Sequence, residues 1–169
     1  MNNKINTFVN ELNKTEFLKN IKVPILDGFT VIDNPNTVFT AVNEDNYIEQ
    51  FLTDGVIKEE FETHIKNVIE DTKNTMREAE LEDVDKSINY VKDYKNNYFD
   101  FKVYTQDNIL NNNLIRQFNI YFMDSDTNAF FQVSLSSAPF VIEKKDYVQE
   151  DLTSSMLMTI NNLMDHITK

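Results

Sequence analysis

Cysteine is absent from this chain of 169 residues, and glycine occurs only twice. Without cysteine there is no disulfide, no thiolate metal site and no cysteine nucleophile. Two glycines leave no room for a glycine-rich loop that cradles phosphates. No stretch approaches the roughly 18 consecutive apolar residues of a membrane-spanning helix. The residues therefore offer neither thiol chemistry nor a glycine-rich nucleotide site, and we expect no association with a membrane.

Positive charge is scarce as well. The chain carries 16 Lys and Arg against 28 Asp and Glu, which gives a formal net charge of −12 near neutral pH. Each contact to a phosphate backbone needs a Lys or Arg, so we expect no binding to nucleic acid. A hydrophobic share of 41% is enough for a folded core, and the length suits one domain over residues 1–169.

The first residues give an expectation about location. Residues 1–7 contain neither an apolar run of signal-peptide length nor a small-residue cleavage site, which favours a cytoplasmic protein. Heavy use of Asn, Ile and Lys is typical of AT-rich bacterial genomes, so we expect a bacterial origin.

Apolar residues at helical spacing predict three amphipathic helices. The first spans about residues 3–19 and ends before Val23-Pro24, because the residue before a proline avoids the α region. The second covers residues 56–76, and the third covers residues 150–168.

Strands are predicted in two groups. Asp27-Gly28 between two apolar runs indicates a hairpin, and Asn34-Pro35-Asn36 indicates a second turn, which together place hairpin strands in residues 21–43. Over residues 87–137 the apolar period changes from 3.6 to 2, which predicts a four-strand antiparallel meander. This order of elements predicts an α+β domain, in which amphipathic helices pack on a single antiparallel sheet.

We find no catalytic set in the sequence. His64 and His166 lie far apart, each on a predicted helix, and no G-x-S-x-G nucleophile motif is present. The acidic run over residues 78–85 is typical of a solvated segment, with a weak cation site or a contact to a basic partner as alternatives. We therefore expect no catalytic residue and no cofactor.

One acidic loop begins like a calcium site and then departs from it. Asp124 and Asp126 occupy alternate positions, but Ala129 stands where the loop needs glycine and Leu135 where it needs a bidentate glutamate. We interpret this segment as a polar hairpin turn, and we expect no metal.

One face of the predicted meander combines aromatic and polar side chains, as protein-binding patches do. Lys102, Asn119 and Ser134 belong to this face, and its predicted partner-binding residues are Tyr98, Tyr104, Tyr121, Phe130 and Gln132. The alternative is that a helix covers the face, so that its mixed composition reflects a half-buried layer.

The segment Val23-Pro24-Ile25-Leu26-Asp27-Gly28-Phe29 resembles a motif of PsbP-like domains, although Phe29 stands where that family has Trp and the spacing from Pro to Gly is longer. The order of elements over about residues 21–168 is also similar. The resemblance implies an α/β/α sandwich that acts as a non-enzymatic scaffold. Members of that fold bind photosystem subunits, a small GTPase or secreted effectors, and share no catalytic residues that could be carried over.

Three hypotheses about function follow. The first is a non-enzymatic protein that binds a basic protein partner, as an adaptor, a secretion chaperone or an immunity-type protein. The second is a domain that binds a small molecule or lipid, or a carboxylate-based enzyme, with a cleft between sheet and helix. The third is a structural subunit that self-associates through the edge of the meander. The partner, the strand order and the oligomeric state stay open.

Overall fold

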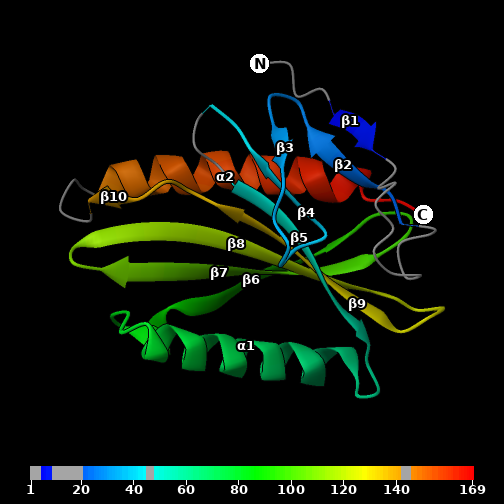
Figure 1. Cartoon of the computed structure of the whole chain (residues 1–169), viewed down its shortest axis with the longest axis horizontal. Coiled ribbons are helices and arrows are strands. Elements are labelled where there is room, and N and C mark those ends of the chain that lie inside the picture. The colour runs from blue at the N-terminus through cyan, green and yellow to red at the C-terminus, as the bar shows by residue number, and fades with distance from the viewer. Residues whose placement is uncertain (1–4, 9–20, 45–47, 142–145) are drawn as a thin grey trace.

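One large antiparallel sheet separates the two long helices of the protein (Figure 1). The computed structural model describes residues 5–8, 21–44, 48–141 and 146–169. The strand order in the sheet is β3-β4-β5-β9-β8-β7-β6, and a short strand β10 pairs with β8. The strands are β3 (Thr30–Ile32), β4 (Phe39–Val42), β5 (Ile48–Val56), β6 (Ile88–Lys95), β7 (Asp100–Leu110), β8 (Asn113–Asp124), β9 (Ala129–Ser136) and β10 (Phe140–Val141). The α+β class is confirmed.

Helix α2 (Asp146–His166) covers one face of the sheet and closes the main core. Side chains in a strand alternate between faces, so every second residue of β7, β8 and β9 points toward α2. Most of these inward residues are apolar and meet the apolar stripe of α2, whereas Arg116 and Asp107 on the same face form an ion pair of 2.9 Å. The stripe consists of Met156, Ile160, Leu163 and Met164, and Ile167 continues it directly after the helix; all five are fully buried.

Helix α1 (Phe61–Glu78) lies on the opposite face, so the arrangement has three layers (Figure 1). Its apolar contact with the sheet is smaller and centres on Ile57, Ile65, Tyr121 and Phe130. A short 3-10 helix, η2 (Val84–Lys86), connects α1 to β6. Among the described residues, no helix combines the length and the apolar character needed to cross a membrane.

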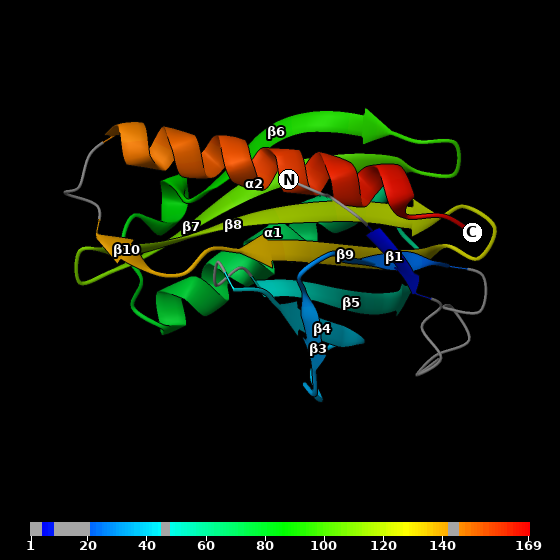
Figure 2. The ribbon, with the colours of Figure 1, turned by 90° about the horizontal axis from the view of Figure 1, so that it is seen from above.

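A two-stranded ribbon stands apart from the large sheet. It pairs β1 (Ile5–Phe8) with β2 (Val23–Leu26), near the C-terminal end of α2 (Figure 2). Lys22 and Thr168 exchange backbone hydrogen bonds of 2.7 and 3.0 Å, which tie the ribbon to the chain after α2.

Most of the predicted elements have counterparts in the structure. Helices α1 and α2 overlap the two predicted helices, although α1 begins at Phe61 rather than at residue 56, which belongs to β5, and α2 begins at Asp146 rather than at residue 150. Strands β6 to β9 form four consecutive antiparallel strands within the predicted meander. The predicted N-terminal helix over residues 3–19 is wrong at residues 5–8, which form β1; its residues 3–4 and 9–19 lie outside the described part of the chain. Pairing with β2 decides this conformation, and the local spacing of apolar residues contains no information about it.

The predicted hairpin at Asp27-Gly28 is also wrong. The turn itself forms, since the Phe29 N–H donates to the Leu26 carbonyl at 3.0 Å and Gly28 adopts φ +86°. However, β2 before the turn pairs with β1, whereas β3 after it pairs with β4. The four residues of β2 are buried and the three residues of β3 are exposed, so the two strands belong to different environments. The second hairpin, across Asn34-Pro35-Asn36, is present between β3 and β4 (Figure 2).

Strand β5 was not predicted, because a glutamate interrupts its apolar pattern. β5 lies inside the sheet between β4 and β9, and Glu49 stands opposite Ala41 and Leu135. The Glu49 side chain is fully buried, and neither carboxyl oxygen has a hydrogen-bond partner among the described residues. Burial raises the pKa of Glu49 to about 8. The residue therefore enters the sheet as a neutral carboxylic acid at neutral pH.

Glu49 makes the stability of the fold depend on pH. From the ordinary pKa of 4.5 up to about 8, the carboxyl is ionised in the unfolded chain but protonated in the folded one. The folded state then holds more protons, so the free energy of unfolding falls as pH rises, by about 1.4 kcal/mol per pH unit for this group.

The substitution Glu49→Gln removes this pH-dependent loss of stability. In urea unfolding followed by circular dichroism, we expect the variant to match the parent near pH 5 and to exceed it by on the order of 3 kcal/mol near pH 8. Equal stability of the two proteins near pH 8 would contradict a buried neutral Glu49.

Candidate functional site

The five residues predicted to bind a partner do not form one open surface. Tyr121 and Phe130 are buried beneath α1, so they lack the exposure that a surface anchor needs. Tyr104 is half-buried against the same cluster. Tyr98, in the turn between β6 and β7, is 50% exposed. The structure therefore agrees, over most of this face, with the alternative that a helix covers it.

Gln132 contributes to a polar network on this face rather than to an open patch. The side-chain oxygen of Asn119 accepts hydrogen bonds from Gln117 at 2.6 Å and from Ser134 at 2.8 Å. Gln132 donates to Ser134 at 3.0 Å, and Asn119 donates to Gln106 at 2.9 Å. Because Asn119 and Ser134 are buried, these bonds satisfy polar groups that the sheet would otherwise desolvate at a cost.

A row of aromatic rings crosses the same face from the sheet edge to α1. Successive ring centroids lie 5.5 Å apart for Tyr90 and Tyr104, 5.7 Å for Tyr104 and Tyr121, and 5.8 Å for Tyr121 and Phe130. The row ends on His64 of α1, whose ring lies 4.4 Å from that of Phe130. Its outer end is Tyr90 on the edge strand β6, which is 54% exposed. Tyr90 lies within the predicted meander over residues 87–137, but it is not among the predicted partner-binding residues.

The turn that carries Tyr98 is held in place by Asn96. The Asn96 side-chain oxygen accepts the backbone N–H groups of Tyr98 at 2.7 Å and Phe99 at 2.8 Å. Its amide donates to the carbonyls of Met164 at 2.8 Å and Ile167 at 2.7 Å, at the end of α2. One side chain thus shapes the turn and fastens it to the helix, which presents Tyr98 on an ordered base.

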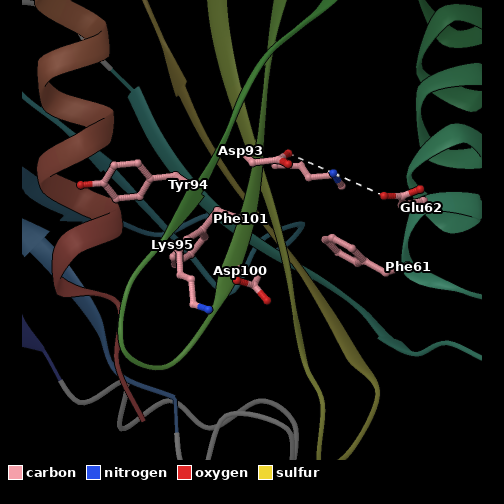
Figure 3. Close-up of a pocket in the computed structure, with 8 residues that line it drawn as sticks. Phe61, Glu62, Asp93, Tyr94, Lys95, Asp100 and Phe101 are labelled. Atoms are coloured by element: carbon pink, nitrogen blue, oxygen red, sulfur yellow. Dashed lines mark hydrogen bonds and ion pairs between the residues drawn. The ribbon is translucent and has the colours of Figure 1, made fainter.

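An open groove of about 480 Å³ lies between the first turn of α1 and the β6–β7 hairpin (Figure 3). We call it the edge groove, because β6 is the last strand of the sheet. Tyr94 and Phe101 border it, but the Tyr94 hydroxyl binds Asp165 of α2 and Phe101 belongs to the main core. The remaining lining residues are Phe61, Glu62, Asp93, Lys95, Asp100 and Lys102.

Lys102 connects the two walls of the edge groove. Its ammonium lies 2.9 Å from Asp93 of β6 and 3.5 Å from Glu62 of α1, the two contacts that are dashed in Figure 3. It also lies 5.9 Å from the centroid of the Tyr90 ring. The Tyr90 hydroxyl also donates to Asp93, at 2.9 Å. The hydrogen bonds from Lys102 and Tyr90 lower the pKa of Asp93, and the bond to Asp93 raises the pKa of Lys102. The groove therefore holds a positive charge between carboxylates and over an aromatic ring.

His64 is a clamp between β5 and α1. Its Nδ1 lies 2.5 Å from Glu59 and its Nε2 lies 2.9 Å from Asp54. Partial burial lowers the pKa of the imidazole, but the hydrogen bonds to Glu59 and Asp54 outweigh this and raise it above the ordinary 6.5. Both ring nitrogens therefore contact a carboxylate, one from β5 and one from the residues just before α1.

The acidic turn after β8 is closed by the chain itself. Asp124 caps the turn by accepting the Asp126 N–H at 3.1 Å and the Thr127 hydroxyl at 3.2 Å. The Lys169 ammonium lies 3.0 Å from Asp124 and 3.1 Å from Asp126. Lys169 of the same chain thus supplies a positive charge to the acidic turn that begins like a calcium site. Within the described ranges, no three acidic or histidine side chains are arranged to hold a metal ion.

No protein-family model matches this chain, and no curated protein matches it. The likeness to PsbP-like domains therefore stays a prediction from the sequence.

The His64 clamp gives a prediction about pH. The clamp stabilises the fold fully below the ordinary histidine pKa near 6.5, and this contribution is lost as pH rises through the higher folded pKa. In an NMR titration we expect the His64 ring to titrate above 6.5. Asp54→Asn and Glu59→Gln should each shift its midpoint downward, because each removes one carboxylate partner. An unchanged midpoint in both variants would show that neither carboxylate holds the ring.

Proposed function

We propose that this chain is a non-enzymatic, cytoplasmic bacterial protein that binds a basic protein partner along the β6–β7 side of its sheet. One observation carries the proposal. Two half-exposed tyrosines, Tyr90 and Tyr98, occupy the same pair of strands and turn as an open groove lined by charged side chains. Tyrosine offers rigid apolar area together with a hydroxyl, which is why it is enriched at binding hot spots.

The charge of the chain supports a basic partner. A net charge of −12 attracts a positively charged surface and repels nucleic acid and anionic membranes. An adaptor, a secretion chaperone and an immunity-type inhibitor all act in this way. The three-layer arrangement is compatible with a PsbP-like scaffold, whose members bind protein partners. The engagement of both His64 nitrogens favours a structural role for that residue.

The edge groove also defines the competing proposal, a small-molecule site. Its volume of about 480 Å³ falls within the range of ligand pockets, roughly 300–1,000 Å³. Such pockets enclose most of their ligand, whereas this groove is open to solvent and five of its eight lining residues carry a charge. These features favour a protein segment over an enclosed small ligand.

Capture of the partner from the native host, followed by titration of the purified pair, tests the proposal. We expect one stoichiometric partner that is retained at low salt and released at moderate salt, because charge attraction is screened. Tyr90→Ala and Tyr98→Ala should each weaken binding about tenfold, or about 1.4 kcal/mol.

Met158→Ala is the matched control for these variants. Met158 is 67% exposed on α2, on the other side of the sheet, so its truncation should leave the affinity unchanged. Equal affinities for the tyrosine variants and this control would contradict the assigned surface, and no partner at either salt would contradict the function.

A further inference from the structure

The edge groove already holds one cation, and that cation belongs to the protein. Lys102 reaches Glu62 of α1 and Asp93 of β6 with its ammonium, near the ring of Tyr90. Positive charge between carboxylates and over an aromatic face is the pattern by which proteins hold cationic side chains. Lys102 therefore indicates that the groove accommodates a cationic side chain.

The carboxylates of the groove have capacity left for a second cation. An ionised carboxylate has about four acceptor sites on its two oxygens. Glu62 and Asp93 are 72% and 66% exposed, and the Glu62 contact of 3.5 Å is an ion pair beyond close hydrogen-bond distance. Among the described residues, no side-chain hydrogen bond or ion pair reaches the third carboxylate, Asp100, at the groove mouth.

The balance of charge in the groove favours an incoming cation over an anion. Three carboxylates, Glu62, Asp93 and Asp100, face two lysines, Lys95 and Lys102, so the lining has a formal charge of −1. The whole chain, with the groove included, carries −12. Arginine suits this lining better than lysine, because its planar fork has five donors, stacks on aromatic rings and loses less hydration.

We propose that the edge groove binds an arginine side chain of the partner, placed between Glu62, Asp93 and Asp100 beside the ring of Tyr90, and that Lys102 is the internal cation with which this arginine competes. The inference rests on the proposed function, since it assigns a chemistry to the same surface. It predicts that removal of the Lys102 charge strengthens binding of the arginine more than removal of a lysine charge elsewhere on the chain does.

The test uses three short, capped peptides of the same length, which contain arginine, lysine or citrulline at the same positions. Citrulline keeps the shape of arginine without its charge. We expect the arginine peptide to shift the backbone NMR signals of Glu62, Asp93, Asp100 and Lys102, and to bind about fivefold more tightly than the lysine peptide. The citrulline peptide should produce no shifts at these residues.

Two lysine variants distinguish a specific arginine site from general electrostatic attraction by the acidic chain. Lys102→Met should raise the affinity for the arginine peptide about fivefold, because it frees Asp93 and Glu62. Lys66→Met makes the same change in charge at an exposed position of α1 outside the groove, and should raise it less than about twofold. Asp100→Asn should weaken binding severalfold, and thermal unfolding confirms that each variant is folded.

Equal gains from Lys102→Met and Lys66→Met would overturn the proposal, as would equal binding of the citrulline peptide or shifts outside the groove. These results would leave the broader function intact if the natural partner still required Tyr90 and Tyr98. Loss of that tyrosine dependence would instead remove the assigned surface together with the arginine site.

Discussion

The packing of α2 against the apolar face of the sheet is the contact on which the rest of this structure depends. Strands β7, β8 and β9 send alternate side chains to that face, and the apolar ones at its core, including Phe101, Phe118 and Val133, are buried there together with the stripe of α2. Burial on this scale provides the main stabilisation of the fold, at about 25 cal/mol per Å² of apolar surface. The opposite face is therefore free to carry polar and aromatic side chains, and α1 covers it with a smaller apolar contact.

The edge groove is a consequence of this unequal division between the two faces. Its walls come from the first turn of α1 and from the polar ends of β6 and β7. Lys102, Asp93 and Glu62 join those walls by charge rather than by apolar contact. Exposed ion pairs contribute little to stability, so these residues can exchange partners at small cost. A surface with that property suits binding.

The sequence predicted those parts of the fold that are determined by local period. The change from a period of 3.6 to a period of 2 near Ser87 locates the meander, and the apolar spacing locates α1 and α2. The prediction failed where contacts between segments distant in the sequence determine the strand pairing or the burial of a residue. Residues 5–8 pair with β2, β2 and β3 separate at Gly28, and Glu49 enters a central strand as a neutral acid. None of these outcomes depends on neighbours within a helical turn or a strand repeat.

The residues of the candidate site likewise fall into those that the sequence predicted and those that it missed. The alternation in β7 to β9 identified the face that carries Tyr104, Tyr121 and Phe130, but it could not show that α1 buries two of them. Tyr98 was predicted and is exposed, because a turn residue has no strand neighbour to cover it. Tyr90 was missed as a binding residue, since its exposure results from the position of β6 at the sheet edge. Lys102 was noticed on this face, but its partners on β6 and α1 become apparent only in three dimensions.

The most direct test of the account is a hydrogen-exchange footprint of the protein with and without its purified partner. We expect slower exchange on binding at the β6–β7 hairpin, the turn around Tyr98 and the first turn of α1, and unchanged exchange in α2 from Thr153 onward. Protection confined to α2, or to the β3–β4 hairpin, would place the partner elsewhere and contradict the assignment of the edge groove.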